Sequence, residues 1–361
     1  MVDEPLSLSA RIHALDTEGM FDHVGGFVDD LAAAFDAVNE HTCPWLDHLR
    51  QRSWAGLLCL GMRGSAAGGS FLSALADHEG TLPVISHADA ELPRWVTSDW
   101  LVLATSYSGN TAETLMATRA AIAEGLSVVV LATGGELAGL AETHDHVHLI
   151  GAPGGQPPRS AFGHIFGRQV ALLRALGALP AGQDQHEMLD RLRTASALHD
   201  PRQGQEGGVE ALAEALLDRT VALLGPSELA PVLTRFKNQI NENAGRFARV
   251  GVVPEMNHNE IVAWGGTGDV ADPTVADQAF LLLTWAGVQP QVRARTTWMV
   301  QHLDTEAAWQ LAGEGSSLLE AMLYHCIVMD WLTVTLALLA GKDPTSIGPI
   351  SSLKAFLATQ H

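Results

Sequence analysis

A short segment in the first third of the chain carries the residues best suited to hold a phosphate. An apolar run at 101–105 leads directly into Ser106, Ser108 and Thr111, and a helix-like segment follows. Three hydroxyls and several backbone N–H groups would then meet at a helix N-terminus, where the macrodipole favours negative charge. Simple capping of the helix is the alternative, although a cap requires only one hydroxyl. We therefore predict a phosphate-binding loop in this segment.

A glycine-rich turn lies upstream of this loop. Residues 61–69 read Gly-Met-Arg-Gly-Ser-Ala-Ala-Gly-Gly and follow an apolar run at 57–60. Glycines permit a ligand to approach the backbone closely. The spacing departs from the GxGxxG pattern of dinucleotide-binding turns, and the chain has no GxxxxGK sequence followed by Ser or Thr. These patterns disfavour a nicotinamide enzyme and a P-loop NTPase.

Three histidines, His144, His146 and His148, stand at alternate positions where a strand is predicted to begin. Alternate residues share one face of a strand, so three imidazoles there could begin a zinc or nickel site. A polar sheet edge is also compatible with this spacing, and the position of the strand before a Pro-rich loop favours that structural role. We therefore expect neither a resident metal nor a cofactor.

Acidic residues outnumber basic ones, with 41 Asp and Glu against 21 Lys and Arg and a formal net charge of −20. The basic residues are scattered, so nucleic acid and anionic membranes are poor partners. The start of the chain lacks the regions of a signal peptide, and the longest strongly apolar stretch, 331–340, is too short to span a bilayer. Three distant cysteines without a CxxC pair suggest no disulfide framework. We expect a cytoplasmic protein.

The elements that must position these residues follow an alternating pattern. Short apolar runs alternate with helix-like segments, which indicates α/β domains with parallel sheets wrapped by helices. In the first half we predict strands at 56–60, 82–86, 101–106, 128–133 and 146–150, and helices at 65–78, 111–124, 135–143 and 161–176. In the second half we predict strands at 220–224, 250–253, 279–284 and 296–301, and helices at 230–243 and 318–339.

A chain of 361 residues, 47% of them hydrophobic, suggests two domains with sizeable cores. The predicted parts are a helical lead-in at 1–50, a first domain at 51–178, a polar linker at 179–208, and a second domain with C-terminal helices at 209–361. Two similar doubly wound halves are the simplest account.

Several motifs resemble those of one enzyme superfamily. Ser106-Tyr-Ser-Gly-Asn-Thr-Ala-Glu-Thr114 resembles the phosphate loop of the sugar isomerase (SIS) domain, and Gly61-Met-Arg-Gly-Ser65 resembles its first turn. Within that superfamily, residues 238–243 (Asn-Gln-Ile-Asn-Glu-Asn) and 254–261 (Pro-Glu-Met-Asn-His-Asn-Glu-Ile) resemble the bifunctional phosphoglucose/phosphomannose isomerase family. Residues 157–161 resemble its arginine loop, and 330–354 its C-terminal segment.

The resemblance implies two SIS domains, a homodimer, and interconversion of glucose 6-phosphate or mannose 6-phosphate with fructose 6-phosphate through a cis-enediol. It implies that Glu242 moves the proton between C1 and C2 and that Arg159 stabilises the enediolate charge. His258, contributed by the partner subunit, and Lys354 would assist ring opening. No metal is needed by this mechanism. The implied phosphate cradle consists of Gly64, Ser65, Ser106, Ser108 and Thr111.

The chain departs from the family pattern at two of these motifs. Arg63 stands where the first turn of the family has glycine, and Gly245 stands where family members often carry Lys. Arg63 could clash with an approaching phosphate or select another substrate, so the preference between glucose and mannose 6-phosphate stays open. A sugar-phosphate sensor without turnover is therefore the alternative function. A metal-dependent isomerase that uses the three histidines is a weaker third hypothesis.

Overall fold

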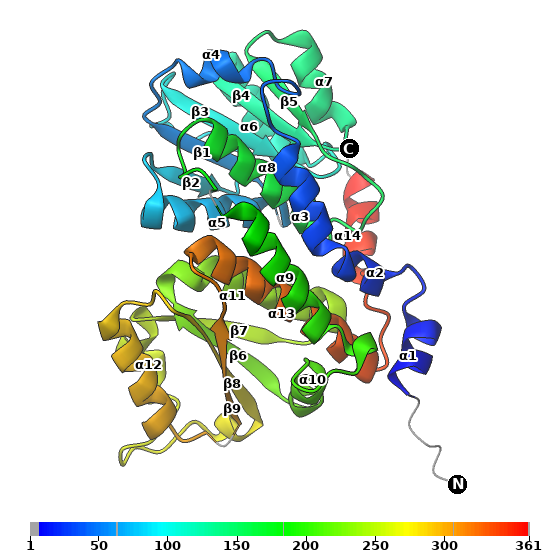
Figure 1. The fold of residues 1–361 in the computed structure, drawn as a ribbon, viewed down its shortest axis with the longest axis vertical. Coiled ribbons are helices and arrows are strands. Elements are labelled where there is room, and N and C mark those ends of the chain that lie inside the picture. The colour runs from blue at the N-terminus through cyan, green and yellow to red at the C-terminus, as the bar shows by residue number, and fades with distance from the viewer. Residues whose placement is uncertain (1–6, 63, 183, 306, 360–361) are drawn as a thin grey trace. The chain divides into compact units, whose positions relative to one another are not determined.

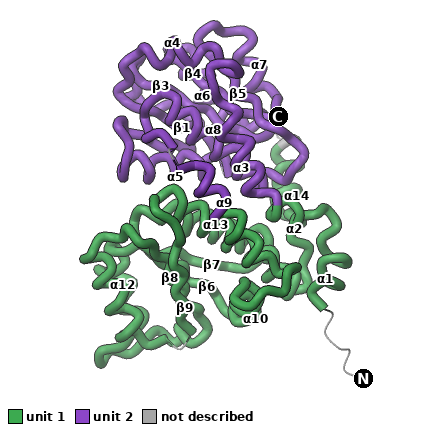
Figure 2. Tube along the Cα trace, in the orientation of Figure 1, with its two compact units in different colours: residues 1–25, 192–361 green, residues 26–191 purple. Residues whose placement is uncertain are grey.

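The computed structural model describes residues 7–62, 64–182, 184–305 and 307–359. The chain forms two compact units: unit 1 consists of residues 1–25 and 192–361, and unit 2 of residues 26–191 (Figure 2). Both are α/β units with parallel sheets, which confirms the predicted fold class (Figure 1).

The unit boundaries differ from the domain boundaries expected from the sequence. Within the expected lead-in, α3 (Phe27–Asp36) packs on α8 (Phe162–Ala175) of unit 2. The preceding α1 (Leu8–Leu15) and α2 (Met20–Gly25) pack instead on α13 (Leu318–Leu339) of unit 1. The expected linker contains a regular helix, α9 (Gln185–His199). Its Ser196 hydroxyl accepts a hydrogen bond from the Trp331 indole N–H in unit 1, at 3.2 Å. Contacts with segments far apart in the sequence thus decide to which unit α1, α2 and α3 belong, and the unit boundary falls within α9.

Unit 2 contains a five-stranded parallel sheet in the order β2-β1-β3-β4-β5 (Figure 1). Its strands are β1 (Gly56–Gly61), β2 (Val84–His87), β3 (Trp100–Thr105), β4 (Ser127–Ala132) and β5 (Val147–Gly151). Its remaining helices are α4 (Leu46–Arg50), α5 (Gly64–Glu79), α6 (Ala112–Ala123) and α7 (Gly135–Thr143).

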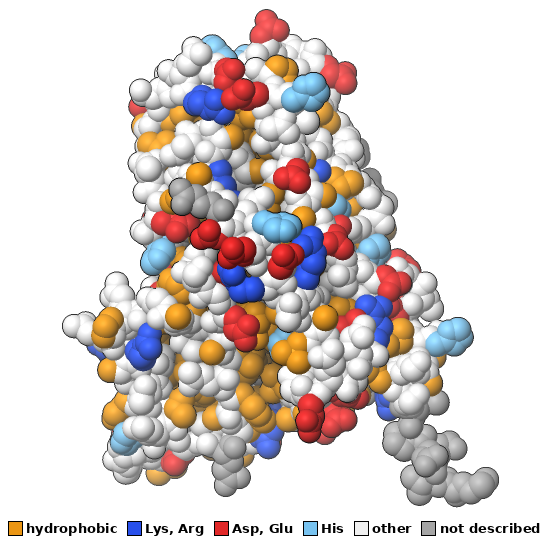
Figure 3. Space-filling view, viewed as in Figure 1, with side chains coloured by type: hydrophobic (Ala, Val, Ile, Leu, Met, Phe, Trp, Pro, Cys, Tyr) orange, Lys and Arg blue, Asp and Glu red, His pale blue; other side chains and the backbone are white. Residues whose placement is uncertain are grey.

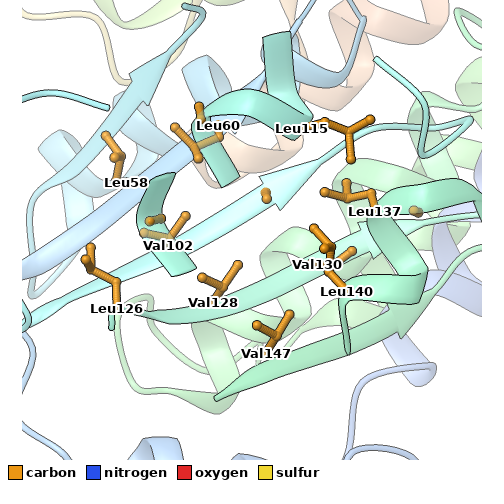
Figure 4. Close-up of a cluster of buried hydrophobic side chains, with 14 residues drawn as sticks. Leu58, Leu60, Val102, Leu115, Leu126, Val128, Val130, Leu137, Leu140 and Val147 are labelled. Carbon is orange, nitrogen blue, oxygen red and sulfur yellow. The ribbon is translucent and has the colours of Figure 1, made fainter. Parts of the chain in front are cut away.

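One face of this sheet carries every second residue of its strands into an apolar core. Leu58, Val102 and Val130 lie on that face, and side chains such as Leu115 of α6 and Leu137 of α7 cover them (Figure 4). All five are at most 8% exposed. Strands that are buried on both faces read as continuous apolar runs, which explains why β1, β3 and β4 could be predicted within a few residues.

Unit 1 contains a four-stranded parallel sheet in the order β7-β6-β8-β9 (Figure 1). Its strands are β6 (Thr220–Pro226), β7 (Ala248–Val253), β8 (Gln278–Trp285) and β9 (Ala308–Gly313). Its further helices are α10 (Glu210–Leu216), α11 (Ala230–Gln239), α12 (Pro290–His302) and α14 (Gly348–Ala358). Short helical turns are η1 (Pro201–Gln203), η2 (Ser227–Leu229), η3 (Ile240–Ala244), η4 (Glu255–His258), η5 (Glu260–Val262) and η6 (Pro273–Asp277).

The predicted strand at 296–301 is wrong, because these residues belong to helix α12. Its Thr, Trp and Val residues have high strand propensity. Pro290 at the first turn favours a helix start, and Met299 is buried against the sheet side of the core. Tertiary packing therefore overrides local propensity here, and the fourth strand of this sheet is instead β9.

Helix α13 corrects the expectation that no segment is long enough to cross a membrane. It spans 22 residues, and its length and hydropathy meet the criteria for a membrane span. Glu320 and Asp330 interrupt the apolar run in the sequence but not the helix. The structure buries 94% of the apolar window within the protein. Helix α13 is therefore the central core helix of unit 1.

Candidate active site

The first sheet has a topological switch point between β1 and β3. From β1 the chain pairs β2 on one side and β3 on the other, so the order of strands reverses there. Loops at the carboxyl ends of two such strands diverge and leave a crevice for ligands. The segments at this point are the start of α5, with Gly64 and Ser65, and the 106–111 loop. They touch, since the Tyr107 N–H donates to Ser65 Oγ at 3.4 Å.

The hydroxyls of the 106–111 loop are arranged to leave the start of α6 open. Ser106 is 1% exposed, and its Oγ lies 3.0 Å from Thr111 Oγ1. Thr111 is the N-cap residue of α6, but its side chain makes no capping hydrogen bond. Ser108 is exposed at the loop surface. The first N–H groups of α6 thus remain for an anion, which favours the phosphate loop over simple capping.

Neighbouring segments hold this loop in place. The Leu137 N–H donates to the Gly109 carbonyl at 2.9 Å, and the Glu136 N–H donates to Asn110 Oδ1 at 3.0 Å. The Thr133 hydroxyl donates to the carbonyl oxygen of Tyr107 at 2.7 Å. The loop is thus fixed on both sides of its turn.

Gly109→Ala is expected to weaken phosphate binding. Gly109 has a φ of 71°, where a side chain costs about 1–2 kcal/mol, and a Cβ there would clash with the Gly134 carbonyl oxygen. The loop must shift, and we expect the KM for a phosphorylated sugar to rise about tenfold, which corresponds to about 1.4 kcal/mol. Steady-state kinetics measure this, with Gly139→Ala as the control, because a Cβ at Gly139 meets open space. An unchanged KM in the Gly109 variant would contradict the assignment.

The arginine loop lies at the same edge of the sheet. The Gln156 N–H donates to the Tyr107 hydroxyl at 3.2 Å, and the Ser160 hydroxyl closes a turn on the Pro157 carbonyl at 2.9 Å. A Cβ added at Gly64 would lie 3.8 Å from the Pro158 carbonyl oxygen, so the first turn adjoins this loop. Unit 2 therefore brings the predicted cradle residues and the arginine loop together.

Arg159 itself is buried, at 9% exposed. Tyr107, between two of the predicted serines, connects its own loop to Ser65 through its N–H, to Thr133 through its carbonyl and to the arginine loop through its hydroxyl. Sequence reasoning missed this role, and the only available signal was the position of an aromatic residue inside the phosphate motif. Arg63 lies outside the described residues.

Unit 1 holds the other three predicted residues. Glu242 lies at the centre of η3, a single turn of π-helix that continues α11, and its side chain is partly exposed. The predicted helix at 230–243 thus changes its winding just before Glu242. π-turns inside α-helices occur frequently at functional sites.

His258 is the last residue of η4 and is exposed. Its neighbours turn elsewhere: Asn257 Nδ2 contacts the Met299 sulfur at 3.1 Å, and Asn259 Nδ2 donates to Glu255 Oε1 at 2.7 Å. Among the described residues, the His258 imidazole makes no hydrogen bond. The imidazole therefore lies on the surface of unit 1. Lys354 is also exposed, on α14.

The three histidines do not line one face of a strand. Strand β5 begins at Val147, so only His148 of the three lies in it. The His148 ring stacks on Trp45 with 4.9 Å between ring centroids, and burial lowers the pKa of His148. Within the described ranges, no three His, Cys, Asp or Glu side chains form a group that could hold a metal. The stacking of His148 on Trp45 is that of a structural residue at the sheet edge.

The second sheet has its own switch point, between β6 and β8, where a carboxylate stands in place of hydroxyl groups. Glu228 follows β6, and its Oε1 accepts a hydrogen bond from the indole N–H of Trp285 at the end of β8, at 3.0 Å. A carboxylate at this position repels a phosphate. The switch point of unit 2 is therefore the better phosphate site of the two. On the face that Figure 3 shows, Lys and Arg side chains are scattered among Asp and Glu. An anion is therefore attracted by local groups, such as the N–H groups at the start of α6, and not by a large basic surface.

Two doubly wound parallel sheets, one with a hydroxyl-lined loop at a helix N-terminus, define a two-domain SIS-type protein. A family model, the bacterial phospho-glucose isomerase C-terminal SIS domain, matches residues 207–357. The bifunctional phosphoglucose/phosphomannose isomerase of Caldicellulosiruptor bescii is 32% identical over 301 residues, which cover 82% of this chain and 88% of that relative. The chain belongs to the bifunctional phosphoglucose/phosphomannose isomerase family, a family of enzymes. This confirms the family predicted from the motifs.

Solved structures share the fold. The C-terminal domain of glucosamine-fructose-6-phosphate aminotransferase from Francisella tularensis has a TM-score of 0.70 at 10% identity and covers 91% of this chain and 98% of its own. The tagatose-6-phosphate ketose/aldose isomerase of Escherichia coli has a TM-score of 0.68 at 15% identity, and the match covers 95% of this chain and 98% of that structure. At these identities the likeness concerns the fold alone.

Proposed function

We propose that this protein interconverts glucose 6-phosphate and mannose 6-phosphate with fructose 6-phosphate. Membership of the isomerase family supports an aldose–ketose reaction on a sugar phosphate. The observation that carries the proposal for this chain is the open N-terminus of α6, beside the hydroxyl pair of Ser106 and Thr111. These groups, with Gly64, Ser65 and Ser108, are proposed to hold the phosphate. The reaction belongs to cytoplasmic hexose-phosphate metabolism in this proposal.

The proposed mechanism moves one proton between adjacent carbons. His258 and Lys354 open the sugar ring by transferring a proton to the ring oxygen and removing one from the C1 hydroxyl. Glu242 then takes the proton from C2 of the aldose and returns it to C1 of the cis-enediol. Arg159 stabilises the negative charge that develops on the enediolate oxygen, because a guanidinium keeps its charge and exchanges no proton.

The same proposal includes a homodimer in which His258 acts in the active site of the partner. The exposed imidazole of His258 suits a group that acts outside its own chain. Val262 and Val270, which follow it, are 66% and 93% exposed, and Leu353 and Phe356 on α14 are more than half exposed. We propose that these exposed apolar side chains belong to the dimer interface.

The experiment that tests the function is an NMR assay of the chelator-treated protein in deuterated water. Glucose 6-phosphate and mannose 6-phosphate are supplied separately, and fructose 6-phosphate and deuterium at C2 are followed. We expect product from both sugars and full activity in excess chelator, because the proposed mechanism uses only side chains. Product from one sugar would fix the epimer preference.

Two other outcomes would each favour a different function. Binding of the sugar phosphate without product and without deuterium exchange would favour the sugar-phosphate sensor. Loss of activity with chelator, restored by a stoichiometric metal, would favour a metal-dependent isomerase. Either result would contradict the metal-independent isomerase.

A further inference from the structure

A buried polar face joins the segment that carries Glu242 to the core helix α13. Arg235 of α11 pairs with Asp330 of α13 through two contacts, Nη1 to Oδ1 at 2.7 Å and Nη2 to Oδ2 at 2.9 Å. The two side chains are only 7% and 4% exposed. Replacing such a pair by apolar residues of similar volume is often neutral or stabilising, so stability alone does not explain it. A buried ion pair can instead fix one register between two helices.

The polar face continues toward the π-turn. Gln239 Nε2 donates to Asp330 Oδ1 at 2.8 Å, and Asn243 Nδ2 donates to Thr333 Oγ1 at 3.0 Å. Gln239 and Asn243 are 5% and 2% exposed, and Thr333 is fully buried. These bonds attach the residues immediately before and inside η3 to two positions of one rigid helix.

The far end of the π-turn is held as well. Gly245 follows the turn in the left-handed region, with a φ of 60°, and its carbonyl accepts a hydrogen bond from Lys342 Nζ at 3.2 Å. A Cβ at Gly245 would clash with the Lys342 amine. The Lys342 amine thus occupies the space that a side chain at position 245 would take.

A π-turn has more residues per turn than an α-helix, so it changes the direction in which the following side chains leave the axis. Glu242 lies between the anchored Gln239 and Gly245 and is next to the anchored Asn243. These contacts therefore hold the backbone on both sides of Glu242.

We propose that Thr333 and Asp330 are positioning residues that hold the π-turn so that the Glu242 carboxylate meets the substrate. This inference rests on the proposed function, because it assigns a purpose to the geometry of the proposed base. Neither residue contacts substrate in this proposal. Their effect passes through the backbone of η3.

Thr333→Val removes the hydroxyl that anchors Asn243 while keeping the side-chain volume. We expect kcat for glucose 6-phosphate to fall about 10- to 100-fold with KM little changed, because misplacing a reacting group costs turnover more than binding. Thr333→Ser, which retains the hydroxyl, should restore kcat. In a Glu242→Gln background the same substitution should have no further effect, because the two residues act through one group.

Thr335→Val is the matched control. Thr335 lies two residues further along α13 and is also fully buried; within the described ranges its hydroxyl bonds only the Trp331 carbonyl of its own helix, at 2.7 Å. It should keep wild-type kcat. Lys342→Met releases the π-turn from its exposed end without disturbing the core, and it should lower kcat in the same direction even where Thr333→Val folds poorly.

The outcomes separate the inference from the function on which it rests. An inactive wild-type protein overturns the proposed function itself. An active wild-type protein whose Thr333→Val and Lys342→Met variants keep normal kcat overturns only the positioning role. If Thr335→Val lowered kcat as much as Thr333→Val does, the loss would be a general effect of removing a buried hydroxyl. That result would also overturn the positioning role.

Discussion

Glu242→Gln is expected to lower kcat by about 10³-fold, the middle of the range for loss of a general base. Glutamine keeps the length and shape of the side chain, so the π-turn η3 and its contacts with α13 should persist. An amide has no proton-accepting carboxylate, and the transfer between C1 and C2 loses its carrier. The KM should change only a few fold, because the phosphate is bound by other groups.

The measurement is steady-state kinetics together with binding of glucose 6-phosphate by calorimetry. Glu214→Gln is the control, since Glu214 is an exposed residue of α10. It removes the same charge from the same unit and should keep wild-type turnover. Residual activity above about a tenth of wild type in the Glu242 variant would exclude this residue as the base.

The phosphate loop could be predicted from the sequence because its signal is local. A strand, three hydroxyls and a helix start lie within a few residues of one another, and neighbouring segments only stabilise what these residues already favour. The inner strands β1, β3 and β4 could be predicted for the same reason, since each is a nearly continuous apolar run. The wrong strand at 296–301 shows the limit, because Thr297 and Trp298 favour a strand while the buried Met299 belongs to a helix face.

The rest of the site depends on contacts between segments far apart in the chain. The π-turn at Glu242 is anchored by Asp330 and Thr333, about 90 residues away. The spacing of Arg235, Gln239 and Asn243 indicates a polar helix face, but nothing near them in the sequence identifies its partner. The division of the lead-in between two units has the same origin, because α1 and α3 differ in what they pack against.

A mixed dimer of Glu242→Gln and His258→Ala subunits is expected to recover activity that neither parent has. His258→Ala alone should lower kcat by about 10²- to 10³-fold through loss of the ring-opening acid. If each site combines Glu242 of one subunit with His258 of the other, the mixed dimer contains one site with both changes and one with neither. Its activity should then be about half that of the wild type.

Coexpression of the two variants with different affinity tags, followed by purification on both tags, yields the mixed dimer for this assay. The tagged wild-type dimer is the reference, and each parent dimer measures the background. If His258 served its own subunit, both sites of the mixed dimer would carry one defect, and activity would stay at the parental level. That outcome would refute the shared site and would leave Glu242 as the base. The exposure of His258 and of the apolar side chains that follow it would then be explained by packing at an interface without a catalytic role.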